Sequence, residues 1–371
     1  MNCRISLSCA MGLESVLKFE LYDLGHKQLA IENGSISLDG TLNDVIQFNL
    51  WCRTAGRVFI ELPTFRAHTF DELFDAVTAI SWAEWLPKNA KCTIDSVSSK
   101  NSDLFSKSDI QSITKKAIIT KLQKTHQTRT IIESGPHIPI RVSIQNNQVT
   151  LKLDTSGHGL NKRGYRTRFD APLRETLAAA MIKLSRWDPE NDALIDPCCG
   201  SGTILIEAGM IANNIAPGLN QTFCSEEWPV FKANEWQNAR EEALSKRRRI
   251  PFRIYGSDVN PDILKTARYN IEKAGLSKIF VETKDVADLR SRFDKGKIIC
   301  NPPYGIRLED QGDTHKLYAN MGRQFKQQFS DWHYYILSGD EDFEEYFNQK
   351  ATKKRKLFNG KIRCDLYQYF N

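Results

Sequence analysis

The pattern of apolar and polar positions divides the chain into two halves in which helices and strands follow one another differently. In the first 155 residues, alternating runs predict strands and amphipathic stretches predict helices, without a glycine-rich phosphate loop. The expected strands are 4–8, 29–32, 35–38, one ending at Leu62, 91–97, 138–145 and 148–154, and the expected helices are 13–24, 41–49, 70–80 and 108–124. We therefore expect this half to bind rather than to catalyse.

From Asp170 onward, helices alternate with buried strands, which is typical of a parallel sheet with crossover helices. The expected strands are 193–195, 252–258, 279–282, 297–300 and 334–337, then a hairpin of 354–358 and 362–369. The expected helices are 171–184, 204–213, one beginning near Ala233 and one beginning at Pro261. Residues 214–251 interrupt this alternation and are expected to form an insertion.

Composition narrows the class of protein. The 371 residues are 41% hydrophobic with a mean hydropathy of -0.44, and no apolar run is long enough for a membrane span or a signal peptide, so a cytoplasmic protein is expected. Nine cysteines without a Cys-x-x-Cys pair predict reduced thiols and no metal site. The net charge of +6 suits a nucleic-acid partner but does not require one.

A strand, a glycine turn and a helix follow one another from Asp196 to Thr203. Gly200 and Gly202 allow the backbone to approach a ligand closely, and Asp196 suits a cationic ligand such as the amino group of a methionine moiety. Cys198 and Cys199 are expected to pack, although the position of Cys199 near a helix N-terminus also allows a lowered thiol pKa.

Two further acids follow predicted strands. Asp258 can accept both hydroxyls of a ribose, or it or Asn260 can cap the next helix. Asp285 can accept from an adenine amino group while the Val286 N–H donates to the ring; the alternative for Asp285 is a turn acid.

The segment Asn301-Pro302-Pro303-Tyr304-Gly305 follows a buried strand, where open α/β sheets bind their ligands. Two prolines form a rigid elbow. The side-chain oxygen of Asn301 and the carbonyl of Pro302 can accept the two hydrogens of an exocyclic amine, while Tyr304 stacks on the plane of the base. The elbow therefore predicts methylation of an amine on a flat group, with an ordinary Asn-Pro turn as the alternative.

Basic segments are open to two interpretations. The lysines of the helix 108–124 and the run 246–249 are either solvated or in contact with RNA phosphates. The glycine-rich segment 156–166 is either an interdomain linker or a hinge that also touches RNA. His158 is expected to be a turn residue, and Glu207 either supports the site or forms a salt bridge.

These motifs and their order, with Gly164-Tyr165-Arg166, the segment 171–176, Ile206-Glu207-Ala208 and Ala216-Pro217-Gly218, resemble THUMP-domain ribosomal RNA guanine-N2 methyltransferases. The chain resembles the guanine-N2 half of the bifunctional large-subunit enzyme, so no guanine-N7 activity is expected. The resemblance implies an α/β protein with a ferredoxin-like segment (1–60), a THUMP RNA-binding domain (61–155), a linker (156–169) and a Rossmann-like class I methyltransferase domain (170–371).

The resemblance also implies S-adenosyl-L-methionine as the cofactor and large-subunit ribosomal RNA, or an assembly particle, as the partner. It assigns Asp196, Gly200 and Gly202 to the methionine end, Asp258 to the ribose, Asp285 and Val286 to the adenine, and Asn301, Pro302 and Tyr304 to the target base, with Asn301 also beside the cofactor. The target base would be extruded from folded RNA into the pocket. Alternatives are a tRNA guanine-N2, a DNA adenine-N6 or a protein glutamine methyltransferase, and a non-catalytic RNA-binding assembly factor.

Overall fold

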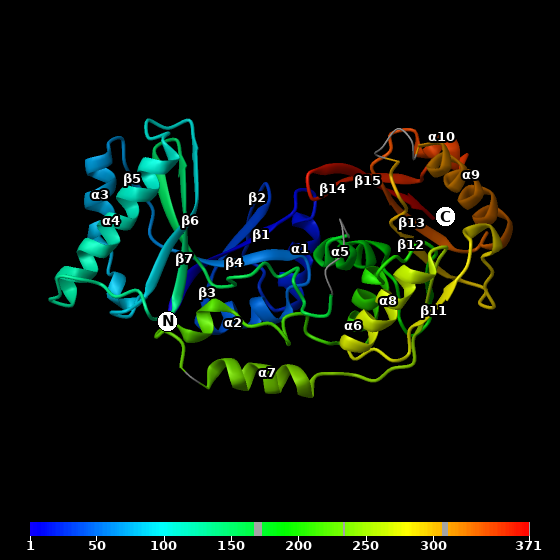
Figure 1. Ribbon diagram of the computed structural model, residues 1–371, viewed down its shortest axis with the longest axis horizontal. Coiled ribbons are helices and arrows are strands. Elements are labelled where there is room, and N and C mark those ends of the chain that lie inside the picture. Colours follow the sequence, from blue (N-terminus) through cyan, green and yellow to red (C-terminus); the bar gives the residue numbers. More distant parts are fainter. Residues whose placement is uncertain (167–172, 233, 306–310, 371) are drawn as a thin grey trace.

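The computed structural model describes residues 1–166, 173–232, 234–305 and 311–370 (Figure 1). The predicted helix start at Ala171–Pro172 and the residue Ala233 lie outside these ranges. Two sheets with their helices make up the molecule, one in each half of the chain.

The N-terminal half contains one eight-stranded sheet in the order β2-β3-β1-β4-β8-β7-β6, with β5 paired to β8. Its strands are β1 (Asn2–Cys9), β2 (Ala30–Glu32), β3 (Ser35–Thr41), β4 (Ala55–Glu61), β5 (Phe65–Arg66), β6 (Lys91–Lys100), β7 (His137–Gln145) and β8 (Gln148–Asp154). Because β4 pairs antiparallel with β8, the segments 1–60 and 61–155 share a continuous sheet. The sequence did not indicate this pairing.

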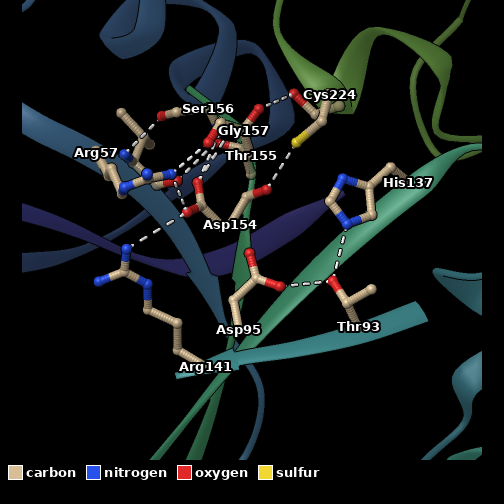
Figure 2. A network of polar contacts seen from close by, with 12 residues as sticks. Arg57, Thr93, Asp95, His137, Arg141, Asp154, Thr155, Ser156, Gly157 and Cys224 are labelled. Carbon is tan, nitrogen blue, oxygen red and sulfur yellow. Dashed lines mark hydrogen bonds and ion pairs between the residues drawn. The ribbon is translucent and has the colours of Figure 1, made fainter. Parts of the chain in front are cut away.

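Helices pack on one face of this sheet. They are α1 (Glu14–Asp23), α2 (Leu42–Trp51), α3 (Phe70–Ala79) and α4 (Lys107–Thr125), with a short 3-10 turn η1 (Trp82–Glu84). Val58 and Ile60 of β4 lie in the core beneath them. Side chains alternate between the faces of a strand, so Arg57 of β4 lies on the opposite face. There it pairs with Asp154 of the neighbouring strand β8, and Arg141 of β7 approaches the same carboxylate (Figure 2).

The C-terminal half contains a seven-stranded sheet in the order β11-β10-β9-β12-β13-β15-β14. Its strands are β9 (Ala193–Asp196), β10 (Arg253–Asp258), β11 (Phe280–Thr283), β12 (Gly296–Cys300), β13 (His333–Ser338), β14 (Lys353–Asn359) and β15 (Ile362–Tyr369). The pairs among β9 to β13 are parallel, and β15 pairs antiparallel with β13 and β14. The predicted parallel sheet with a closing hairpin is therefore confirmed.

Each face of the second sheet has its own core. Leu194 and Ile299 pack with α5 (Glu175–Ser185), α6 (Thr203–Ala212) and α8 (Pro261–Lys273). Ile195 and Ile298, their neighbours in sequence, face the other side and pack with α9 (Gln311–Gln328) and α10 (Phe343–Phe347). Neither α9 nor α10 was among the expected helices.

The expected insertion, residues 214–251, joins the two halves. It contains the turn η2 (Cys224–Glu227) and α7 (Glu235–Ser245), which lies beneath the N-terminal half in Figure 1. Trp228 and Trp236 are buried in the N-terminal core, and the Trp228 Nε1 donates to the His137 carbonyl at 3.1 Å. The insertion thus fixes the first half of the molecule against the second.

Across the described ranges, no helix has the length and apolar character needed to cross a membrane. Within the same ranges, no group of three or more His, Cys, Asp or Glu side chains is arranged to hold a metal ion.

Candidate active site

Four neighbouring parallel strands end at one edge of the C-terminal sheet, and each brings a predicted site residue there. Asp196 ends β9 and Asp258 ends β10, while Asp285 follows β11 and Asn301 follows β12. The parallel register places Gly256 beside Asp196, so Asp258 lies just beyond it. The structure therefore gathers the acids and the elbow at the edge where open α/β sheets bind ligands.

The glycine turn between β9 and α6 has the left-handed backbone that favours glycine. Gly200 has φ +51° and Gly202, the residue that caps α6, has φ +84°. The Gly200 N–H donates to the Asp258 carboxylate at 3.0 Å, and the Cys199 N–H donates to the Ser257 carbonyl at 2.9 Å. These bonds hold the turn against the end of β10.

Asp196 is a buried acid, with only 1% of its surface exposed. It accepts the Cys198 N–H at 3.1 Å, and in the described part of the chain no Lys, Arg or His forms an ion pair with it. Burial raises the pKa of its carboxyl well above the usual range, and the nearby negative charge of Asp258 adds to this rise. A buried carboxyl beside a glycine turn fits a ligand that brings its own cation, such as the ammonium of a methionine moiety.

The two strand-end acids that follow differ in their local roles. Asn260, not Asp258, caps α8, because its Oδ1 accepts the N–H groups of Asp262 and Ile263. Asp258 instead bonds to the glycine turn, through the Gly200 N–H. Asp285 is exposed, and its Oδ1 accepts the Ala287 N–H at 2.8 Å at the start of the 3-10 turn η3 (Val286–Asp288), so the turn role foreseen for it is present.

The elbow after β12 is held by two tyrosines. The Tyr304 hydroxyl donates to the Asn301 side-chain oxygen, and the Tyr318 hydroxyl of α9 donates to the Pro303 carbonyl at 2.7 Å. Burial raises the pKa of both phenols, so both remain protonated donors at neutral pH. The contact with Tyr304 orients the Asn301 amide, a role that sequence reasoning did not foresee for this tyrosine.

A cavity of about 760 Å³ lies at this edge. Its lining includes Asp285, Val259 beside Asp258, Pro303 and Tyr304 of the elbow, and Thr314 of α9. The cavity therefore connects the acid assigned to adenine with the elbow assigned to the target base.

The suggestion of a lowered thiol pKa for Cys199 is wrong. Burial raises the pKa of the thiols of Cys198 and Cys199 well above the usual range, and the negative charge of Asp196 raises both further. A thiol in such surroundings is not a nucleophile at neutral pH. The interpretation as packing residues stands.

A buried ionic cluster lies behind the glycine turn, and it confirms the salt-bridge alternative for Glu207. Glu207 of α6 is an ion-pair partner: its Oε1 lies 3.4 Å from the Arg163 Nε and accepts the Tyr165 hydroxyl at 3.1 Å. Arg166 donates to the Thr203 hydroxyl at 2.7 Å at the first residue of α6. The motif Gly164-Tyr165-Arg166 therefore braces the helix that carries the glycine turn. The residue types of this motif did not predict that it would pack against α6.

Three segments of the chain match known families. Residues 163–368 match the family described as RMKL-like, methyltransferase domain. Residues 4–59 match an RlmL ferredoxin-like domain and residues 67–154 match a THUMP domain. These matches confirm the fold class and the family resemblance expected from the sequence.

Individual proteins are similar over nearly the whole chain. The chain is 41% identical to the "Putative RNA methyltransferase YpsC" of Bacillus subtilis (strain 168), over 97% of this chain and 94% of that protein. It is 34% identical to the "Ribosomal RNA large subunit methyltransferase K/L" of Psychromonas ingrahamii, over 97% of this chain but only 49% of that protein. The crystal structure of SMU.472 complexed with SAH is 38% identical, with a TM-score of 0.94 over 100% of this chain and 98% of that one.

Proposed function

Because the chain belongs to the family of RMKL-like methyltransferases, we propose that it methylates the exocyclic N2 of a guanine in large-subunit ribosomal RNA. It is an RNA methyltransferase whose methyl donor is S-adenosyl-L-methionine. The choice of guanine N2 and of large-subunit RNA is the proposed part. The chain spans about half the length of the K/L relative.

The observation that carries the proposal is the neutral elbow at the end of β12. Asn301 and Pro302 offer oxygen acceptors, which match an amine that has two hydrogens to donate. The side-chain oxygen of Asn301 accepts the Tyr304 hydroxyl, which fixes the orientation of the amide. The second lone pair of the same oxygen is left to accept a hydrogen of the target amine. An amine held in this way presents its nitrogen for attack, with no need to lose a proton beforehand.

The proposed roles of the other residues follow from their places at the sheet edge. Asp196 binds the ammonium of the methionine end, Gly200 and Gly202 line that end, and Asp258 binds the ribose. Asp285, which lines the cavity, and Val286, the next residue, contact the adenine.

The donor supplies a methyl group on a positively charged sulfur, so no covalent intermediate with the protein is needed. The nitrogen would form a bond to the methyl carbon as the carbon–sulfur bond breaks, leaving a neutral thioether, and the extra amine proton would then pass to solvent water. This chain contributes by holding the amine in line, and such positioning can lower a barrier by about 7–11 kcal/mol.

The test is transfer of labelled methyl from S-adenosyl-L-methionine to three unmodified substrates: a large-subunit rRNA transcript, a tRNA transcript pool and duplex DNA. A matched arm offers the rRNA in assembly particles. We expect N2-methylguanosine in the rRNA. Label confined to tRNA or to DNA adenine would contradict the proposed substrate. Formation of N2-methylguanosine only in the assembly particles would support the proposed base and show that the RNA must be bound in a particle.

A further inference from the structure

A second cavity lies on the α9 side of the C-terminal sheet. Its volume is about 400 Å³, a size that suits a small ligand or a nucleotide. It is lined by Ile195, Tyr255, Ser257, Phe280, Leu289 and the segment 290–293 among others. None of these residues lines the cavity at the elbow.

This cavity exists because no helix of the described ranges covers the outer strands β10 and β11 on this face. The connection from β11 to β12, residues 284–295, is fully described and contains only the 3-10 turn η3. On the opposite face, the same strands are covered by α8 (Figure 1). As a result, Phe280 of β11 keeps 54% of its surface exposed.

Aromatic rings and guanidinium groups gather around the cavity. The ring of Tyr255 lies 6.3 Å from that of Phe280 and 5.7 Å from that of Phe293, measured between centroids. The guanidinium groups of Arg253 and Arg292 lie 5.0 and 5.1 Å from the Phe293 ring. The Phe280 ring is exposed, while the Tyr255 and Phe293 rings are half-buried. Aromatic rings beside arginines are the combination with which proteins bind single-stranded nucleic acid, through base stacking and phosphate contacts.

One buried polar atom points to a ligand with a polar edge. Ser257 is 2% exposed and lines the cavity, and its hydroxyl has no hydrogen-bond partner within the described residues. A buried hydroxyl without a partner destabilises the protein, and a ligand that bonds to it would remove this cost. The one carboxylate in the lining, Glu282, is already paired with Lys284.

We propose that this cavity binds one nucleotide of a single-stranded RNA segment, outside the target base. The base lies against Phe280 and Tyr255 with its polar edge at Ser257, and the phosphate contacts Arg292. This inference rests on the proposed function only in that the substrate is RNA. It is independent of which base is methylated.

The test is the affinity of the full-length protein for a fluorescein-labelled 12-nucleotide single-stranded RNA of random sequence, measured by anisotropy. We expect Phe280→Ala to weaken binding about five- to one-hundredfold, the range for loss of one stacking ring. The matched control is Tyr269→Ala, which removes an equally exposed ring, 53%, from α8 on the other face. Phe280→Leu keeps the apolar bulk if the alanine variant does not fold, and should show the same loss.

Arg292→Gln should reduce the slope of log affinity against log salt by about 0.7, one phosphate contact on a single strand. Affinity for S-adenosyl-L-methionine should stay unchanged in all these variants, which separates this site from the methyl-transfer site. Equal binding by Phe280→Ala and Tyr269→Ala would overturn the proposal. So would 5′-GMP competing as strongly as the 12-nucleotide RNA, because the site would then serve a free nucleotide.

Discussion

Among the residues that the structure describes, each sheet holds one buried aspartate at the end of a strand, and the two have opposite electrostatic surroundings. Asp154 of β8 and Asp196 of β9 are both 1% exposed, and burial raises the pKa of both carboxyls. Asp154 has cationic partners that oppose the rise: Arg57 at 2.6 Å and Arg141 at 3.8 Å (Figure 2). Within the described residues, Asp196 has one backbone N–H as its hydrogen-bond donor and a like charge nearby.

The difference teaches how a structural acid is distinguished from a ligand-binding one. Asp154 also accepts the N–H groups of Ser156 and Gly157, so it organises the turn that leaves the first sheet. Its charge is balanced by the protein itself. The charge of Asp196 is balanced by no side chain in the described residues, which is what a site for a cationic cofactor requires.

The largest effect is expected at the sheet edge that carries Asp196, Asp258 and Asn301, here called the functional edge, and it should change methyl transfer without changing stability. Asn301→Ala should lower methyl transfer by about 10²–10³-fold or more, because it removes a positioned hydrogen-bonding group at the reacting nitrogen. Affinity for S-adenosyl-L-methionine and the melting temperature should change little. Single-turnover transfer assays and calorimetric titration provide the two readouts, and equal losses in both would contradict the role assigned to Asn301.

The next largest effect is expected on the free energy of unfolding, at Asp154 in the first sheet. Asp154→Ala should lower the free energy of unfolding by about 2–4 kcal/mol, because two arginines and two backbone N–H groups lose their acceptor. Asp39→Ala on the same sheet is the matched control, since its ion pair with Arg4 is exposed and should be worth no more than about 1 kcal/mol. Urea denaturation measures both. Similar losses in the two variants would remove the contrast drawn for Asp154.

Asp258 tests whether the functional edge binds the cofactor as proposed. Asp258→Ala should weaken S-adenosyl-L-methionine binding about ten- to one-hundredfold, the loss expected when a charged group gives up its hydrogen bonds to a ligand. Asn260→Ala is its control, because it removes only the cap of α8. If Asp258→Ala bound the cofactor with unchanged affinity, ribose recognition by this acid would be excluded.

The sequence predicted which residues gather at the functional edge, but it did not predict the surroundings of Asp154. Asp196, Asp258, Asp285 and Asn301 each follow a predicted strand, and parallel strands place such residues together. The sequence could not show that Tyr304 would bond to Asn301, because that depends on how the elbow folds back after β12.

Long-range contacts account for the rest. The pairing of β4 with β8, the helix α9 and the packing of Trp228 into the first half depend on partners distant in sequence. The local periodicity of apolar residues does not predict these long-range contacts. The wrong suggestion for Cys199 has the same origin, since position at a helix N-terminus is local, whereas the burial that raises its thiol pKa is tertiary.

The central claim, that Asp196 is kept for a cation that the protein does not supply, is tested by thermal unfolding of Asp196→Asn. A buried carboxyl whose pKa is raised destabilises the folded protein above the unfolded pKa, near 3.8, and this cost disappears as the pH falls below that value. The neutral amide keeps the bond from Cys198 and avoids the cost. We expect a gain of about 0.5–2 kcal/mol at pH 7, shrinking toward pH 4.

The measurement is the melting temperature of the wild type and Asp196→Asn at pH 7, each with and without S-adenosyl-L-methionine. We expect the variant to melt higher than the wild type without the cofactor and to gain little when the cofactor is added, while the wild type gains several degrees. A variant that melts lower than the wild type, yet is still stabilised by the cofactor to the same extent, would show that Asp196 is a structural acid like Asp154.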